Sequence, residues 1–254
     1  MDPTLEPVPQ PVLVLSNPPH GDVDVAAAGP VVGLAPADLR LKVNYAVPEI
    51  WLAEDEQAAA DAAATRLRAA GFRVVVVPGA ALAEIPERRP VPVFTFESDA
   101  LVLEAAESVR LAYGAPLLAV QCSVRPGEAK AALPPSFLDL YAVVESALGR
   151  WTVVQGATEF GGLAGRATAS FGTNVQTLTS EIERRFSRAT VDRRLVNMQV
   201  RRRVGAPPPG VVRRGFSYAT APLHELLDRL KPGLSEMEHQ ELASRLVFLT
   251  HAAG

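Results

Sequence analysis

Short apolar runs alternate with helical stretches over the first third of the chain. The apolar runs are brief and closed by turn-forming residues, which favours buried strands, and the stretches between them have helical composition. The predicted elements are strands at 12–15, 50–53 and 72–77, and helices at 22–28, 36–45 and 55–70. Gly29-Pro30 and Gly33 separate the first two helices, and Gly71 stops the third. The order strand–helix–helix–strand–helix–strand predicts a small α/β module over residues 12–83.

The pattern changes beyond residues 84–92, which are polar and rich in proline and therefore predict a linker between two domains. Strand-like runs follow it, and the last two flank residues 146–149 as a hairpin. The predicted strands lie at 93–96, 101–103, 109–113, 117–124, 137–144 and 150–155. A helix over 174–187 follows, with Asn174 as its N-cap and an apolar face formed by Val175, Leu178, Ile182 and Phe186.

Two helices are expected near the end of the sequence, at 222–230 and 235–252. The second begins with a capping box, Ser235 with Glu238, and its apolar stripe indicates that it docks on another element. The stripe consists of Met237, Leu242, Leu246 and Leu249. The fold class is therefore α+β: a small α/β module, a mainly antiparallel β module with a capping helix, and C-terminal helices. The predicted divisions are a Pro-rich tail (1–11), the α/β module (12–83), the linker (84–92), the β module (93–215) and the terminal helices (216–254).

Residues 31–77 read VVGLAPADLRLKVNYAVPEIWLAEDEQAAADAAATRLRAAGFRVVVV. The Gly-Leu-x-x-x-Asp-Leu helix, the Val-x-x-x-Val-Pro step and the Glu-x-Ala…Leu-x-x-Ala-Gly-x-x-Val-x-Val ending resemble the C-terminal domain of the bacterial ribosomal stalk protein. That resemblance implies an α/β fold. The stalk domain recruits translation factors through a lysine-rich helical face, whereas the corresponding face here holds Arg40 and Lys42. The activity is therefore not carried over.

The order of strands and one capping helix over residues 93–187 resembles the layout of pleckstrin-homology-like barrels. The similarity is one of layout, without a diagnostic motif. A partly open sandwich would fit the same order.

Composition sets the class of protein. Of the 254 residues 48% are hydrophobic and 21% charged, which are globular values. Abundant alanine, and arginine in place of lysine, indicate a GC-rich bacterial coding bias. Cys122 is the single cysteine, so neither an intramolecular disulfide nor a Cys-based zinc site is expected, in keeping with a reducing cytoplasm. We expect no signal peptide and no membrane span, because charges, glycines or prolines interrupt every apolar run.

Candidate chemistry is sparse. The glycines of residues 161–166 lack the strand–turn–helix setting and the Lys-Ser/Thr of a phosphate loop, which favours a plain turn. Cys122 lies in an apolar strand, which favours a buried thiol over a nucleophile. The four histidines form no metal-ligand spacing, and the carboxylates of residues 54–56 mark a helix start. No catalytic site, cofactor or metal is expected.

Charge is distributed unevenly along the chain. Residues 1–110 hold 16 Asp/Glu and 8 Lys/Arg, a net of −8, whereas residues 111–254 hold 12 and 17, a net of +5. The arginines of the second part are crowded, and we predict a partner-binding surface within residues 184–214. It comprises Arg184, Arg185, Arg188, Arg201, Arg202, Arg203, Arg213 and Arg214.

Four readings of these arginines stay open: pairing with the acidic first module or with Glu181, Glu183 and Asp192; a protein partner; nucleic acid; and anionic lipid. Few aromatic residues lie between them, which disfavours nucleic acid. The sequence thus predicts a non-catalytic binding or scaffolding protein of a bacterial cytoplasm that binds protein or itself. The alternatives are an enzyme whose dispersed polar residues meet only in the fold, and a nucleic-acid or anionic-lipid binder.

Overall fold

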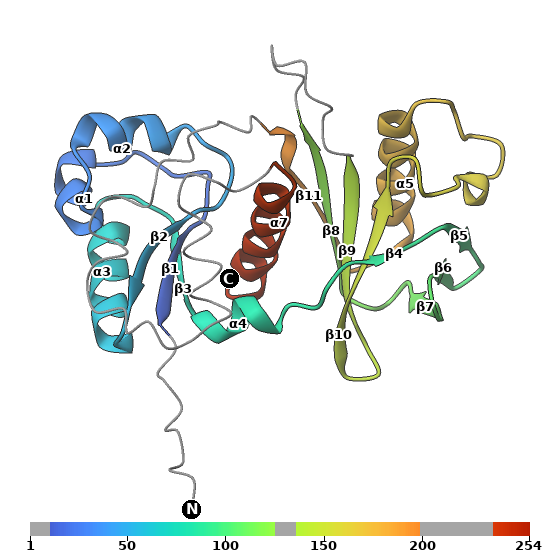
Figure 1. Ribbon diagram of the computed structural model, residues 1–254, viewed down its shortest axis with the longest axis horizontal. Helices are drawn as coiled ribbons and strands as arrows, with labels where there is room; N and C mark the ends of the chain where they lie inside the picture. Colours follow the sequence, from blue (N-terminus) through green and yellow to red (C-terminus); the bar gives the residue numbers. More distant parts are fainter. Residues whose placement is uncertain (1–10, 125–135, 199–235) are drawn as a thin grey trace, which may run out of the picture. The chain divides into compact units, whose positions relative to one another are not determined.

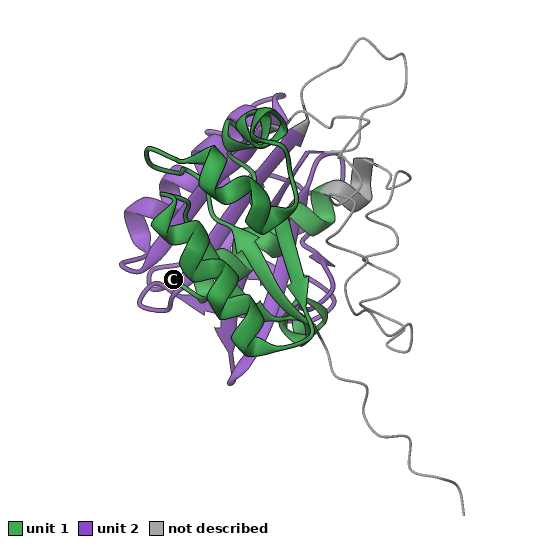
Figure 2. Ribbon diagram, turned by 90° about the vertical axis from the view of Figure 1, so that its left-hand side faces the viewer, with its two compact units in different colours: residues 1–84, 201–254 green, residues 85–200 purple. Residues whose placement is uncertain are grey.

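The computed structural model describes residues 11–124, 136–198 and 236–254. The chain divides into two compact units, residues 1–84 with 201–254 (unit 1) and residues 85–200 (unit 2), coloured separately in Figure 2. Helices and antiparallel sheets occur in both, so the predicted α+β class is confirmed. No helix among the described residues is long and apolar enough to cross a membrane.

Unit 1 is built on a three-stranded sheet of order β2-β1-β3. Its strands are β1 (Val12–Ser16), β2 (Ile50–Glu54) and β3 (Val74–Pro78). Its helices are α1 (Val25–Val32), α2 (Pro36–Val43), α3 (Gln57–Ala69), α4 (Gly79–Glu84) and α7 (Glu236–Ala252). The central strand β1 is antiparallel to both neighbours, and α3 connects β2 to β3 (Figure 1). The predicted element order through β3 is confirmed.

One face of this sheet packs against α1 and α3. Val14 and Leu52 lie opposite each other in the β1–β2 register and join the same apolar core as Ala28 of α1 and Leu67 of α3. Ala60 and Ala64 of α3 are fully buried there, and their small side chains let the helix approach the strands closely. The alanine-rich helix is therefore fixed by packing on the sheet.

The first helix differs from the prediction. Asp24 caps it by accepting hydrogen bonds from the N–H groups of Ala26 and Ala27 at 2.9 and 3.0 Å, so α1 starts at Val25. It continues through Pro30 and ends at Gly33, whose φ of 69° is left-handed. The predicted break at Gly29-Pro30 is therefore wrong.

The last helix of the chain packs on α4. Arg245 of α7 donates a hydrogen bond to the carbonyl of Leu82 at 3.2 Å. Leu242, Leu246 and Leu249 are buried, which confirms the predicted apolar stripe at these positions. Ser235, the side chains of Met237 and Glu238, and the predicted helix at 222–230 lie outside what the structure describes.

Unit 2 contains two sheets, one of order β11-β8-β9-β10-β4 and one of order β5-β6-β7. The strands are β4 (Arg89–Pro90), β5 (Val93–Phe96), β6 (Ala100–Glu104), β7 (Ser108–Ala112), β8 (Leu117–Val124), β9 (Phe137–Val144), β10 (Ala147–Val154) and β11 (Ala189–Met198). Between them lie a 3-10 turn, η1 (Gly161–Leu163), and α5 (Phe171–Arg185). The named pairs from β5 to β10 are antiparallel as predicted, whereas β11 pairs with β8, and β4 with β10, in parallel.

The predicted hairpin is confirmed with a tighter turn. Residues 145 and 146 alone connect β9 to β10, and Glu145 and Ser146 have φ angles of 50° and 70°. Two residues at positive φ match the twist of the flanking strands. The strand β10 consequently begins at Ala147, three residues earlier than predicted.

The core of unit 2 lies under α5. Leu138 and Leu140 of β9 and Trp151 of β10 pack with the helix face Val175, Leu178 and Ile182, and Phe186 follows at the helix end. The sheet β5-β6-β7 adds Phe94, Leu101, Leu103 and Leu111 to the same core. The apolar face predicted for this helix is therefore confirmed, and it packs α5 against the core that includes residues of the sheet β5-β6-β7.

Candidate protein-binding surface

Helix α5, which carries Arg184 and Arg185 in its last turn, begins earlier than predicted. The Ser170 hydroxyl accepts a hydrogen bond from the Thr173 N–H at 3.3 Å and caps a helix that starts at Phe171. Asn174, predicted as the N-cap, lies inside the helix and is buried. Its amide ties the preceding loop to α5, because Oδ1 accepts from the Thr168 N–H at 2.7 Å and Nδ2 donates to the Thr168 carbonyl at 2.8 Å.

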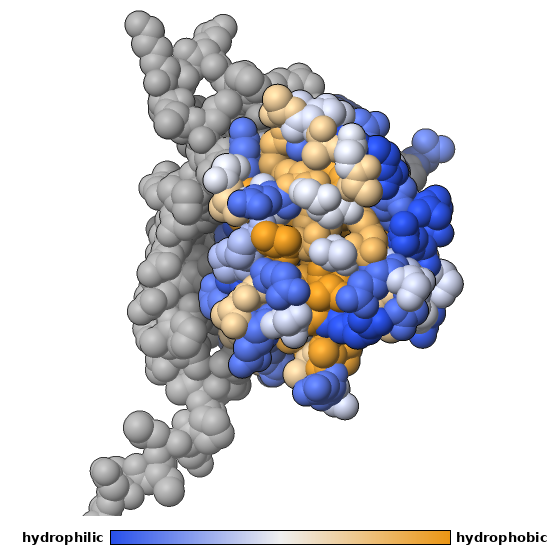
Figure 3. Space-filling view, turned by 90° about the vertical axis from the view of Figure 1, so that its right-hand side faces the viewer, coloured by the Kyte–Doolittle hydropathy of each residue, from blue (hydrophilic) through white to orange (hydrophobic). Residues whose placement is uncertain are grey.

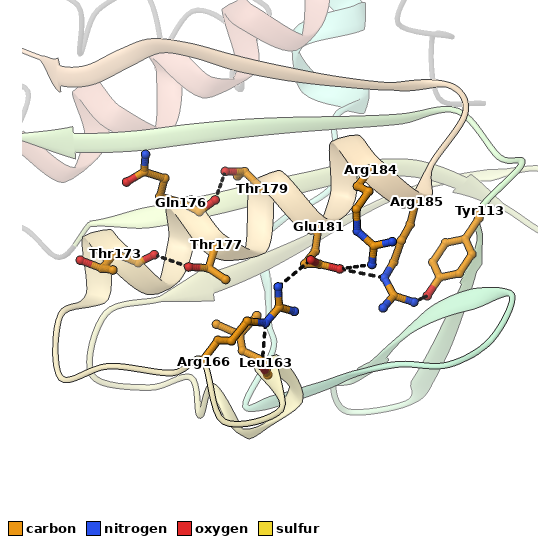
Figure 4. A network of polar contacts seen from close by, with 10 residues as sticks. All are labelled: Tyr113, Leu163, Arg166, Thr173, Gln176, Thr177, Thr179, Glu181, Arg184 and Arg185. Atoms are coloured by element: carbon orange, nitrogen blue, oxygen red, sulfur yellow. Dashed lines mark hydrogen bonds and ion pairs between the residues drawn. The ribbon is translucent and has the colours of Figure 1, made fainter.

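Glu181 gathers three arginines at the other end of α5 (Figure 4). Its carboxylate accepts hydrogen bonds from Arg184 at 2.5 Å, Arg166 at 2.7 Å and Arg185 at 3.0 Å. These bonds, that of Arg184 first and that of Arg166 next, lower the pKa of Glu181 to about 2. The side chain of Glu181 is 8% exposed, whereas those of Arg184 and Arg166 are 61% and 50% exposed. The carboxylate is thus an ionised anchor beneath guanidinium groups that reach the surface.

Arg185 links α5 to the sheet β5-β6-β7. Its guanidinium lies 4.9 Å from the centre of the Phe96 ring and 5.7 Å from that of Tyr113, within the range of cation–π attraction. It also donates a hydrogen bond to the Tyr113 hydroxyl at 3.2 Å. Tyr113 in turn donates to the carbonyl of Glu97 at 2.8 Å. The guanidinium of Arg185 therefore joins the C-terminal end of α5 to Phe96, the last residue of β5, and to Tyr113, which follows β7.

Aromatic rings continue along the same side of unit 2. Phe160 lies 5.7 Å from Phe171 and 5.8 Å from Phe94, and Phe94 lies 6.0 Å from Phe96, each pair edge to face. Phe94 is fully buried, whereas Phe96, Tyr113, Phe160 and Phe171 are half-buried. We call these four residues the aromatic band. Figure 3, which views the molecule from the right-hand side of Figure 1, shows apolar side chains in the middle of that face, with hydrophilic residues among and around them.

Gly162 in η1 makes this packing possible. A Cβ at this position would overlap the carbonyl oxygen of Phe94, so only glycine lets the turn lie against β5. The glycine-rich segment 161–166 is therefore a packing turn, as expected, and Arg166 extends from it to Glu181.

The other predicted arginines fall into two groups. Arg188 is exposed and forms no ion pair within the described part of the chain, while its backbone carbonyl accepts from the Leu117 N–H at 3.2 Å. The remaining predicted residues, Arg201, Arg202, Arg203, Arg213 and Arg214, lie outside the described residues. Local pairing is confirmed for Arg184 and Arg185 with Glu181, and it extends to Arg193 with Glu183 at 3.0 Å and Arg194 with Asp192 at 2.7 Å.

Carboxylates occupy the sheet next to these arginines. Glu97 and Asp99, at the β5–β6 turn, both bond to Arg110. At the opposite end of the sheet Glu104 accepts a hydrogen bond from the Ser108 hydroxyl at 3.4 Å, and Glu107 is exposed without an ion pair among the described residues. We call residues 104–107 the acidic turn. Residues 85–200 hold 12 Asp/Glu and 12 Lys/Arg, so unit 2 has no net charge.

A second polar cluster lies inside unit 2 and was missed by sequence reasoning. Asp139 accepts hydrogen bonds from Thr152 at 2.6 Å, Arg150 at 2.7 Å and Arg88 at 3.1 Å, and the side chains of Asp139 and Arg150 are 0% exposed. The residues are far apart in sequence and meet through the hairpin register, which places Asp139 opposite Thr152. The signal was a charged residue in the otherwise apolar strand β9. These groups bind one another inside the protein, which suits a structural network.

Two further side chains considered for catalysis or metal binding, Cys122 and His20, are buried and half-buried. Cys122 is buried, as predicted, and burial, with the charge of Asp139 adding to it, raises its pKa to about 12. His20 contacts the rings of Trp51 and Phe72, which also contact each other, and its Nδ1 accepts the Arg73 N–H at 3.2 Å. Across the described residues, no three His, Cys, Asp or Glu side chains group as metal ligands.

Comparison of the chain with protein-family models, with curated protein sequences and with solved structures finds no match.

Proposed function

We propose that this chain is a non-catalytic protein-binding component, and that its binding surface is the aromatic band with the arginines around Glu181. The observation that carries the proposal is a run of rings from Phe171 through Phe160 and the buried Phe94 to Phe96, where the guanidinium of Arg185 lies over the half-buried Phe96 ring. Aromatic residues and arginine are enriched at the centres of protein interfaces, where a partner desolvates them. We also propose that the protein acts in a bacterial cytoplasm, which agrees with its single cysteine and its arginine-biased composition.

The charge arrangement supports a protein partner over nucleic acid. Arg184, Arg185 and Arg166 share one carboxylate, and unit 2 as a whole is neutral. A domain that binds nucleic acid strongly usually has a net positive charge, because its affinity comes from neutralising many phosphates. A cluster of modest excess charge beside aromatic rings suits a partner segment that combines acidic and large apolar side chains.

A peptide selection tests the proposal. The full chain, immobilised sparsely so that each molecule presents its surface alone, is used to select binders from a displayed library of random peptides. We expect the selected peptides to be enriched in Asp, Glu and large apolar residues. Phe171→Ser and Arg184→Ala should each weaken the binding of a selected peptide by about tenfold or more, about 1.4 kcal/mol, in fluorescence anisotropy.

Two substitutions elsewhere on unit 2 serve as matched controls. Val143 is a large apolar residue, 62% exposed, at the end of β9, and Arg89 is an exposed arginine on β4. Val143→Ser and Arg89→Glu should leave peptide affinity unchanged. Circular dichroism checks that every variant is folded. Peptides of random composition, or binding that is equally strong in Phe171→Ser and Arg184→Ala, would overturn the proposal.

A further inference from the structure

We propose that the edge of β7 that faces away from β6 binds an extended, basic segment of a partner protein, which joins the sheet β5-β6-β7 as a further strand. The inference goes beyond the proposed function, because the exposed side chains of β7 lie on the sheet face opposite to Phe94 and Phe96. It is carried by the hydrogen-bonding groups along this edge, by the protection of the other edges of unit 2, and by the negative charge beside β7.

The free edge of β7 presents backbone groups at the spacing of a strand. Tyr113 donates its N–H to the carbonyl of Asp99 at 3.0 Å, so the alternating antiparallel ladder directs the odd-numbered residues of β7 to β6 and the even-numbered ones outward. Ser108 and Arg110 therefore present both N–H and C=O at this edge, and Ala112 presents its N–H. All three residues are exposed, and the described part of the chain places no strand beside them. An extended backbone has N–H and C=O groups at the same spacing and can pair with them.

The other three sheet edges in the described part of unit 2 each carry a feature that hinders strand addition. Beside β5, Glu159 donates its N–H to the carbonyl of Pro92 at 2.7 Å, and η1 lies against Phe94. The strand β4 has two residues, of which Pro90 lacks an N–H, and the register of β11 with β8 is interrupted. The strand β7, by contrast, pairs with β6 in continuous register and contains no proline (Figure 1). Covers, prolines and bulges protect sheet edges, so an edge without them is open to another chain.

Arg110, in the middle of β7, leaves this edge accessible. Its guanidinium bonds to Glu97 and Asp99 at the β5–β6 turn, so the side chain extends across the sheet and away from the free edge. A charged side chain that pointed outward would hinder an incoming strand. Here two carboxylates of the same sheet hold the charge, and the backbone of β7 keeps its outward groups.

The small sheet is acidic. Residues 93–113 hold four carboxylates and one guanidinium, a net of −3. Glu104 lies opposite Ser108 in the register and on the same face as Arg110, and Glu107 is exposed in the acidic turn beside it. A strand added along β7 brings its side chains on this face near Glu104 and Glu107. Lysine or arginine at these positions is attracted, whereas aspartate or glutamate meets like charge.

Peptides designed as strands test the inference on the full chain. One peptide is long enough to pair with all of β7 and alternates valine with lysine and threonine, and a second has glutamate in place of lysine. We expect the basic peptide to bind with a dissociation constant below about 1 mM in an NMR titration, and the acidic one at least tenfold more weakly. Methylation of the backbone nitrogens at one set of alternate residues of the basic peptide should block binding. Methylation at the other set should not, because only one set faces β7.

Amide hydrogen exchange of the chain, followed by NMR, locates the bound peptide. The N–H groups of Ser108, Arg110 and Ala112 should exchange at least tenfold more slowly when the basic peptide is bound. Those of Val109 and Leu111, which face β6, should be protected with and without the peptide.

Two pairs of variants separate strand addition from general effects of substitution. Ala112→Pro removes an outward N–H while the bonds to β6 stay, and it should weaken binding of the basic peptide at least tenfold, whereas Ala112→Val keeps the N–H and should bind normally. Glu104→Lys with Glu107→Lys should also weaken binding at least tenfold. Glu145→Lys, at the exposed β9–β10 turn, should leave it unchanged. Circular dichroism checks that every variant is folded.

The outcomes keep this inference separate from the proposed function. No binding of the basic peptide up to about 1 mM, equal binding of both designed peptides, or outward N–H groups that stay unprotected in the complex would overturn strand addition. Protection of these groups in the free chain that increases with its concentration would also overturn it and assign the edge to a second copy. Peptides selected on the aromatic band should bind Ala112→Pro as they bind wild-type chain, so either proposal can fail while the other stands.

Discussion

Glu181 fixes the positions of three arginine side chains, because all three donate hydrogen bonds to its carboxylate. With its pKa at about 2, it stays ionised through the physiological range and fixes Arg184, Arg166 and Arg185 in a single geometry. Ordering these long side chains before a partner arrives removes part of the entropy cost of binding. At the scale of the residue, local pairing is therefore compatible with the proposed partner binding by the same arginines.

Cys122 should react slowly in the native protein. Burial and the nearby charge of Asp139 raise its pKa to about 12, so the thiolate is scarce at neutral pH and reagents do not reach it. We expect labelling by a thiol reagent at pH 7.5 to take hours in buffer and to be complete within minutes in denaturant, followed by mass spectrometry. Rapid labelling of the folded chain would contradict the buried environment.

His20 should make the stability of unit 1 depend on pH. Burial, with the positive charge of Arg73 adding to it, lowers the pKa of His20 in the folded chain. As pH falls, the unfolded chain takes up the proton first, so the stabilisation present above about pH 6.5 is lost as pH falls through that value and on towards the lower folded pKa.

We expect the urea midpoint to fall between pH 7.5 and pH 5.5, and to fall less in His20→Gln. Glutamine can accept the Arg73 N–H without titrating. Because all other titrating groups are common to both proteins, the difference isolates His20. An equal fall in both would show that His20 does not contribute.

At the scale of the element, the apolar pattern along a single strand or helix predicted that element, whereas contacts between different elements left no pattern in the sequence. The strands β1, β2 and β3, the hairpin β9–β10 and the buried face of α5 all followed from apolar periodicity. Asn174 shows why ends are harder to place. It has the residue type of an N-cap, but Ser170 occupies that position, and only the fold of the preceding loop decides between them.

The candidate surface was predicted only in part for the same reason. Arg184 and Arg185 were named from the sequence, while Phe96, Tyr113, Phe160 and Phe171 were not. Each ring comes from a different element, and no spacing in the sequence brings β5, the β7–β8 turn, η1 and α5 together. The parallel pairing of β11 with β8 was likewise unexpected, because register between distant strands leaves no local pattern.

Two neighbouring glycines in η1 should respond differently to alanine. A Cβ at Gly162 would overlap the Phe94 carbonyl, whereas a Cβ at Gly161 meets no atom within 4 Å. We expect Gly162→Ala to lower the free energy of unfolding by about 2 kcal/mol through displacement of β5, and Gly161→Ala to change it by less than about 0.5 kcal/mol. Chemical denaturation of both variants measures the difference, and similar values would contradict the close packing of η1 on β5.

The buried pair of β9 and β10 should be sensitive to loss of charge. Asp139→Asn removes the negative charge from beside Arg150 and Arg88 while keeping the size of the side chain. We expect a loss of about 3–5 kcal/mol, as for other broken buried pairs. Thr152→Val removes one hydroxyl donor to the same carboxylate and should cost about 1–2 kcal/mol. Urea unfolding gives both values, and a small effect of Asp139→Asn would show that the pair contributes little net stability.

At the scale of the whole molecule, the charge split along the sequence does not coincide with the structural units. Unit 1 holds 16 Asp/Glu and 13 Lys/Arg, a net of −3, and unit 2 is neutral. Most of the split lies within unit 1, because residues 1–84 hold 11 Asp/Glu and 5 Lys/Arg, a net of −6, whereas residues 201–254 hold 5 and 8, a net of +3. Unit 2 contributes a net of −2 over residues 85–110 and of +2 over residues 111–200. The charge split therefore does not describe two oppositely charged domains.

The two segments of unit 1 have a consequence for how the chain is made. The helix α7 packs on α4, yet more than a hundred residues, including all of unit 2, are translated between them. During synthesis from the N-terminus, every residue of unit 2 leaves the ribosome before α7 exists. Unit 1 begins first and is completed last, so the nascent chain carries the α4 surface without its partner helix for most of its synthesis.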